Sequence, residues 1–232
     1  MRKPYKFLKG QSDVVSAVII IVIAIGLVGT AYMWGLPLIQ KRQDSSLVER
    51  TFSYFNDNNA NSLVKKIDFI ARNGGEDTFS VDINGVWILH PCNDAGVSGC
   101  LSDYDFNNNS IDFSLFSRVS NIGVDQGWVS LSSTDTCPGG TAPIGDKPYI
   151  VCARADTVPE GYNITYRVQF RENEESSSQG SQRGFKFILI PTLSGLTTST
   201  TKSIRISRGN IYSKDMGNGE TLIITEMKIL LG

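Results

Sequence analysis

Hydrophobic positions divide this chain into one long apolar run near its N-terminus and shorter periodic patterns after it. From Val14 to Trp34, 21 consecutive residues carry no charge, and Ser16 and Thr30 are the only small hydroxyl side chains among them. As a helix rising about 1.5 Å per residue, the run spans roughly 30 Å, the thickness of a bilayer's hydrocarbon core. A long helix in a soluble core keeps a polar stripe, which this run lacks. The pattern therefore predicts a membrane-inserted helix.

The helical pattern continues beyond the apolar run and becomes amphipathic. Apolar residues recur at a loose helical spacing as far as Phe55, now mixed with charged side chains. Pro37 is expected to kink or break this helix just before its own position. After the polar stretch FNDNNANS, the segment SLVKKIDFIARNGG predicts a short second helix, which Asn61 can cap and Gly74 can end in a left-handed turn.

After the second helix the hydrophobic period changes from 3.6 to 2, the spacing of β-strands. TFSVDI and VWIL flank Asn84-Gly85, a strong hairpin signal. In YNITYRVQFR, one face carries Tyr162 and its alternate neighbours, and the other carries Asn163 and its own. FKFILIP, KSIRISRGNIYS and TLIITEMKILL predict further strands, and ENEESSSQGSQRG a solvated loop. The expected fold class is α+β, a long N-terminal hydrophobic helix followed by a mainly antiparallel, β-sandwich-like domain.

These patterns predict four segments along the 232 residues. They are a basic leader peptide (1–10), a membrane or assembly helix (11–56), a short connecting helix (57–76) and a β-rich, extracellular head domain (77–232).

Charge adds an orientation to this picture. The totals, 22 Lys+Arg against 23 Asp+Glu, leave no basic excess of the kind that nucleic-acid binding needs. Four cations and no acid stand in the first ten residues, whereas only Lys41 and Arg42 follow closely after the apolar run. Because cytoplasmic flanks carry the excess of Lys and Arg, we expect the N-terminus in the cytoplasm and the rest of the chain outside.

Three kinds of N-terminal segment share a basic start followed by an apolar stretch. A secretory signal peptide would be cut after the small residues Gly29-Thr30-Ala31 and would release a soluble domain that begins at Tyr32. An uncleaved anchor would keep the whole segment. A prepilin-type signal would be cut before the apolar run, and the continued helical pattern beyond the run favours this third kind over a discarded signal.

The segment KGQSDVV, at residues 9–15, resembles the processing site of archaeal type IV pilin-like proteins, whose signals are called class III signal peptides. The resemblance implies that a membrane-bound prepilin peptidase recognises Lys9 and cuts between Gly10 and Gln11. Ser12 and Asp13 match the Ser and acid that are common at the second and third mature positions of that family. The N-terminal pattern does not match that of archaellins.

The same resemblance implies how the mature chain assembles. Asp13 would cost roughly 2.5–3.5 kcal/mol at a bilayer centre, and the new amino group at Gln11, on its own or a neighbouring subunit, can offset that cost. Alternatively, Asp13 only caps the helix. The implied partners are the membrane before assembly and then identical or related pilin subunits in a homo-polymer, with no nucleic acid. Small residues would set the packing register, namely Ala17, Ala24, Gly26 and Gly29.

Four cysteines, Cys92, Cys100, Cys137 and Cys152, lie in the predicted external part. An even number of cysteines in an oxidising compartment predicts disulfides, and of the three possible pairings we favour the two local ones, Cys92–Cys100 and Cys137–Cys152. A zinc site is the alternative, but no CxxC spacing occurs and His90 is the only histidine. We therefore expect no metal and no cofactor.

Two N-x-S/T sequons, at Asn108 and Asn163, are possible N-glycosylation sites on an external domain. Asn108 is the better candidate at this level, because it lies in the polar run NNNS and Asn163 in a predicted strand. No catalytic residues are predicted: the single histidine has no evident partner, and CPGGTAPIG lacks the Lys-Ser/Thr of a phosphate loop.

The sequence thus favours a structural subunit of a type IV pilus-like surface filament that acts in adhesion or attachment. It would be a single-pass membrane precursor first and a surface filament afterwards. Two alternatives remain. One is a membrane-anchored accessory protein, such as a minor pilin or an archaellum stator-like protein, that binds the cell envelope through its β domain. The other is an adhesin-like module whose sheet recognises a glycan or surface polymer.

Overall fold

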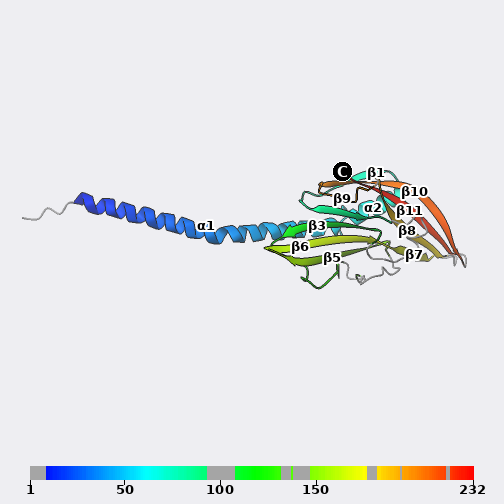
Figure 1. The fold of residues 1–232 in the computed structure, drawn as a ribbon, viewed down its shortest axis with the longest axis horizontal. Helices are drawn as coiled ribbons and strands as arrows, with labels where there is room; N and C mark the ends of the chain where they lie inside the picture. The colour runs from blue at the N-terminus through cyan, green and yellow to red at the C-terminus, as the bar shows by residue number, and fades with distance from the viewer. Residues whose placement is uncertain are drawn as a thin grey trace, which may run out of the picture. The chain divides into compact units, whose positions relative to one another are not determined.

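The structure, a computed structural model, describes residues 9–92, 108–131, 137, 147–176, 182–193, 195–217 and 220–232 (Figure 1). The chain divides into two compact units between Gln43 and Asp44, which are described separately. The first unit is helical, and the second contains a short helix and two β-sheets. The expected α+β class with a β-sandwich-like domain is therefore confirmed.

Helix α1 (Lys9–Phe55) runs without a break through Pro37. Of the kink or break expected at Pro37, the break does not occur, because a proline removes one backbone hydrogen bond while the bonds before and after it remain. In the first unit, the large apolar side chains from Val14 to Trp34 are each more than half exposed. Among the described residues α1 is the one helix long and apolar enough to cross a membrane.

Helix α2 (Leu63–Asn73) begins one residue later than the predicted cap would place it. Ser62, and not Asn61, is the N-cap residue, and its side chain makes no capping hydrogen bond. Gly74 is the C-cap residue, as predicted, but it does not form the predicted left-handed turn: its φ is +81° and its ψ is −175°, and its N–H donates to the carbonyl of Ile70 at 2.8 Å. Glycine adopts this conformation without steric cost.

Within the described residues, sheet A has five strands. Neighbouring strands are antiparallel except for one parallel pair, β11 with β8. In spatial order the strands are β1 (Glu76–Ser80), β10 (Ser203–Gly217), β11 (Glu220–Leu231), β8 (Gln182–Pro191) and β7 (Glu172–Ser176). Strand β7 corrects the predicted loop ENEESSSQGSQRG, because its first residues pair with β8 and Glu172 lies opposite Lys186.

Sheet B has six strands in the part of the chain that the structure describes, and each strand pairs antiparallel with its neighbours. In spatial order they are β4 (Val129–Ser130), β5 (Tyr149–Val158), β6 (Gly161–Phe170), β3 (Ser110–Ser117), β2 (Val86–His90) and β9 (Thr198–Ser199). Strands β8, β10 and β11 of sheet A and β6 of sheet B confirm the strands predicted from alternation. Strands β3 and β5 were not predicted.

The predicted hairpin at Asn84-Gly85 is wrong, because β1 and β2 belong to different sheets. β1 pairs with β10 in sheet A, and β2 pairs with β3 and β9 in sheet B. The glycine is needed for a different reason. A Cβ at Gly85 would lie 2.3 Å from the ring of Phe113 and 2.7 Å from the carbonyl oxygen of Ser114. Residue 85 is therefore a point of close approach where the chain crosses between sheets.

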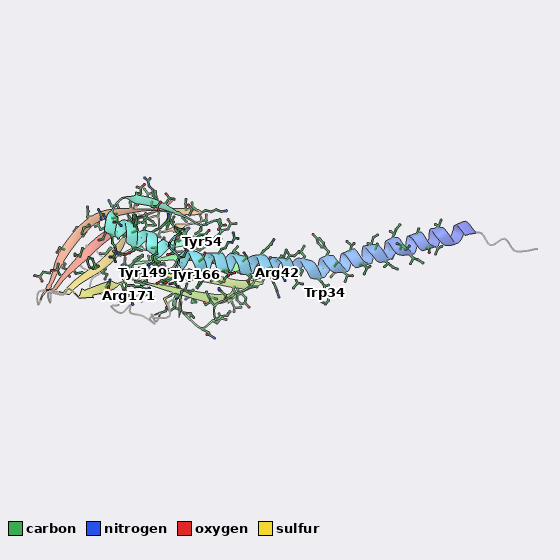
Figure 2. All side chains as sticks on the ribbon, turned by 180° about the vertical axis from the view of Figure 1, so that it is seen from behind. Trp34, Arg42, Tyr54, Tyr149, Tyr166 and Arg171 are labelled. Atoms are coloured by element: carbon green, nitrogen blue, oxygen red, sulfur yellow. A yellow bond between two sulfur atoms is a disulfide. The ribbon has the colours of Figure 1, made fainter. Side chains whose placement is uncertain are left out.

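The core lies between the two sheets and includes α2 and the last turns of α1. Phe55 is fully buried, and its ring is 5.2 Å from that of Tyr166 and 6.0 Å from that of Phe113. Tyr166 lies beside these turns of α1 (Figure 2), with its hydroxyl 3.4 Å from the carbonyl oxygen of Val48. Residues 44–55 of α1 are thus an integral part of the head, which we define as the second unit.

Candidate functional site

The predicted processing residues lie in the first turns of α1. The helix includes Lys9, Gly10, Gln11 and Asp13, but the side chains up to Asp13 lie outside what the structure describes. Proximity of Asp13 to an amino group therefore stays a prediction.

The four small residues predicted for assembly do not share one face of α1. At about 100° per residue, Ala17 and Ala24 point in similar directions, whereas Gly26 and Gly29 point elsewhere. No side chain or distant backbone comes within 4 Å of a Cβ built at either glycine. The hydroxyl of Thr30 donates to the carbonyl of Gly26 at 2.7 Å, so this polar group is satisfied inside the helix.

The outer face of sheet B carries a cluster of side chains around a buried ion pair. We call it the outer-face cluster and define it as His90, Asp112, Arg167, Trp128 and Arg154. Asp112 on β3 lies directly opposite Arg167 on β6. The guanidinium donates two hydrogen bonds of 2.7 Å to the carboxylate, one to each oxygen. Both side chains are less than a tenth exposed. This bidentate geometry is the strongest form of an Arg–carboxylate pair.

Trp128 extends the cluster to strand β5. The guanidinium carbon of Arg167 lies 4.5 Å from the centre of the Trp128 ring, and that of Arg154 lies 5.0 Å from it. Two cations near one indole are stabilised by its π-face. Trp128 also contacts an apolar group that contains Ile150 and the disulfide between Cys137 and Cys152. The segment before β4 is thereby attached to the sheet.

The electrostatics of Asp112 are those of a structural ion pair. Burial would raise the pKa of Asp112, but hydrogen bonds from His90 and Arg167 outweigh burial, so the pKa is lowered and the group is ionised at neutral pH. His90 Nε2 is 3.2 Å from the carboxylate. Ser110 lies opposite His90 in the register, but its hydroxyl is fully buried and has no hydrogen-bond partner among the described residues. Ser110 is thus not hydrogen-bonded to His90, as the nucleophile of a catalytic triad would be.

The structure describes three of the four cysteines, so it tests only part of the predicted disulfide pairing. Cys137 and Cys152 form a disulfide, as predicted. Cys92 is also disulfide-bonded. Its predicted partner, Cys100, lies outside the described residues. Within the described ranges, no group of three or more His, Cys, Asp or Glu side chains is placed to hold a metal ion.

The two sequons lie in different surroundings. Asn163 is half-buried on β6, on the outer face of sheet B. Asn108 directly precedes Asn109, which is buried, has φ +55° and connects both sheets. The Asn109 amide donates to the carbonyl of Phe187 at 2.7 Å and accepts from the N–H of Leu189 at 2.8 Å.

Sequence reasoning missed Asp112, Arg167 and Trp128. The only available signal was the second face of β6, where Arg167 and Gln169 are polar yet almost fully buried. The chain matches no known protein-family model, no curated protein and no solved structure. The function must therefore be argued from the chain's own residues.

Proposed function

We propose that this chain is a subunit of a type IV pilus-like surface filament, processed after Gly10 and assembled through the apolar part of α1. One observation carries the proposal: α1 is a single helix whose Val14–Trp34 part is exposed and apolar and whose last turns lie in the core of the head. Such a helix suits a subunit that is first held in lipid and then transferred into a bundle of like helices.

The exposed apolar side chains favour this function over a secreted soluble domain. A chain cut at Tyr32 would still carry Met33 and Trp34, which are 77% and 76% exposed, and Leu38, which is 62% exposed. A contiguous apolar surface of this kind in water marks an interaction site or an aggregation risk. A membrane or a helix bundle covers it.

Assembly gives little free energy from burial alone, because lipid and neighbouring helices are equally apolar. The register in which neighbouring helices pack must then be set by side-chain packing and by polar groups at the helix ends. In this proposal Asp13 pairs with the amino group that cleavage creates at Gln11. The Asp13→Ala variant should therefore be processed normally but should yield fewer filaments, and normal assembly of Asp13→Ala would reduce Asp13 to a helix cap.

The experiment is mass spectrometry of surface filaments purified from the source organism. We expect abundant peptides that begin at Gln11, and we expect Gly10→Phe to accumulate as an unprocessed membrane precursor. A mature N-terminus at Tyr32 would contradict the proposal. Presence in membranes but absence from filaments would instead support the second candidate, a membrane-anchored accessory protein, for which the exposed helix serves equally well as an anchor.

A further inference from the structure

Three cross-strand pairs lie in a row on the outer face of sheet B, between β3 and β6. Asp112 faces Arg167, Ser114 faces Thr165, and Phe116 faces Asn163. The row changes from a buried ion pair, through a side-chain hydrogen bond of 2.9 Å between Ser114 and Thr165, to an exposed end. Alternation along a strand puts all three pairs on one face.

Phe116 is an exposed aromatic side chain at the end of this row. It is 51% exposed, and among the described residues its ring contacts no other aromatic ring. The ring lies over Gly161, because a Cβ built there would be 2.9 Å from Cζ of Phe116. Gly161 precedes Asn163 by two residues on the same face of β6, so the ring is held beside Asn163 with much of its surface open to solvent.

Asn163 is the first residue of the sequon Asn163-Ile164-Thr165. Its side chain is half-buried and makes no hydrogen bond within the described ranges. On β6's other edge it faces Asp156 of β5, whose side chain is 39% exposed. Asn163 therefore has an exposed aromatic residue opposite it on β3 and a carboxylate opposite it on β5. Arg154 Nε donates to Oδ2 of Asp156 at 2.9 Å, so the carboxylate has its other oxygen to offer a sugar.

We propose that Asn163 carries an N-linked glycan whose first sugar packs on the ring of Phe116. The apolar C–H face of the sugar covers the ring, and Asp156 accepts hydrogen bonds from sugar hydroxyls. The inference rests on the part of the proposed function that places the head outside the cell, and it does not require a filament.

The transfer step needs a lipid-phosphate-linked oligosaccharide as donor. The Nδ2–C1 bond forms, the bond between C1 and the phosphate oxygen breaks, and one amide proton is lost while the lipid phosphate leaves. The backbone of β6 is paired with β3 and β5 on both edges. Transfer therefore precedes the pairing of β6, and the folded head then accommodates the sugar at its outer face.

The first test is glycopeptide mass spectrometry on the full chain isolated from the membranes or filaments of its own organism. We expect the peptide that contains Asn163 to carry a glycan, which Asn163→Gln removes and Thr165→Ser retains. An unmodified Asn163 in chains that contain the Cys137–Cys152 disulfide overturns the proposal. The same digest reports whether the N-terminus is Gln11, so failure of this inference is distinct from failure of the proposed function.

The second test separates packing on Phe116 from attachment alone. In protein from the native host we expect Asn163→Gln to lower the melting temperature by about 2–4 °C, and we expect little further change when Phe116→Ala is already present. Phe69→Ala, at another exposed phenylalanine, is the matched control and should leave the effect of Asn163→Gln intact. If Asn163→Gln lowers the melting temperature equally in the presence and absence of the Phe116 ring, the sugar does not pack on that ring. In a host without N-glycosylation, Asn163→Gln should have no effect.

Discussion

Asp112 and Arg167 hold opposite charges inside a sheet face that alternation alone would assign to solvent. Desolvation of two charges is costly, and the bidentate geometry, His90 and the Trp128 ring together compensate for it. Such a pair adds little net stability compared with an apolar pair, but removal of one partner leaves an uncompensated buried charge.

Replacement of Asp112 by Asn should destabilise the head by about 3–5 kcal/mol at neutral pH, because Arg167 is then buried without its carboxylate. The pKa of Asp112 is lower in the folded head than in the unfolded chain. Its contribution is therefore fully present above the unfolded pKa of about 3.9 and is lost as pH falls through the lower, folded pKa.

Urea unfolding of the wild-type protein and the Asp112→Asn variant across pH 2 to 7 measures this difference. We expect the difference in the free energy of unfolding between the two proteins to decrease as the pH falls toward 2. Asp82→Asn, which removes a carboxylate that is 55% exposed, is the control. A gap that stays constant down to pH 2 would contradict the ion-pair account.

Gly74 offers a second test at the residue scale. A Cβ there would lie 2.5 Å from Nη2 of Arg208, whose guanidinium also lies 3.4 Å from the Ala71 carbonyl oxygen at the end of α2. Gly74→Ala should therefore cost about 1–3 kcal/mol from the positive φ at this position, plus displacement of Arg208. Gly75→Ala is the matched control, because Gly75 has φ +92° but nothing within 4 Å of its Cβ. Chemical denaturation should show the larger loss for Gly74→Ala, and equal losses would exclude a role for Arg208.

At the scale of elements, the central feature is that strands adjacent in sequence are separated in space. The chain leaves sheet A after β1 and enters sheet B at β2, and the N–H of Val81 donates to the carbonyl of Lys202 at 2.7 Å on the way. The close approach of Gly85 to Phe113 allows this crossing. As a result, both sheets contribute side chains to the same core as α2 and the end of α1.

The disulfide between Cys137 and Cys152 stabilises the head at this scale. The bond connects β5 to a segment 15 residues earlier, and such a loop closure contributes about 3 kcal/mol by restricting the unfolded chain. We expect the double variant Cys137→Ser/Cys152→Ser to lose roughly that amount in denaturant unfolding. Tryptophan fluorescence should change as well, because Trp128 packs against the apolar cluster of Ile150 and Cys152. An unchanged midpoint would show that the disulfide does not stabilise the head.

At the scale of the whole molecule, the boundary between the two units does not coincide with the end of the apolar helix. The head includes residues 44–55 of α1, where Val48 and Phe55 are almost completely buried. The sequence-level division at residue 56 would place these residues outside the head. One helix thus serves two environments. Its Val14–Trp34 part is an exposed apolar surface, and residues 44–55 contribute Val48 and Phe55 to the core of the head.

A chain that begins at Asp44 should fold into a soluble head with nearly the stability of the full chain in detergent. A chain that begins at Leu63 should fail to fold, because loss of Phe55 alone removes a buried aromatic side chain worth about 3–5 kcal/mol. Circular dichroism and thermal unfolding of the two truncated chains measure this directly. Cooperative unfolding of the Leu63 chain would show that the end of α1 is dispensable to the head.

Much of this protein follows from its sequence alone. The apolar run, both helices and the most regular strands were predictable, because hydrophobic periodicity and a C-terminal glycine act over a few residues. Tertiary structure alone decided the separation of β1 from β2, the passage of α1 through Pro37 and the burial of Asp112 with Arg167. These depend on partners distant in sequence, and a local pattern contains no information about which strand or charge will lie opposite.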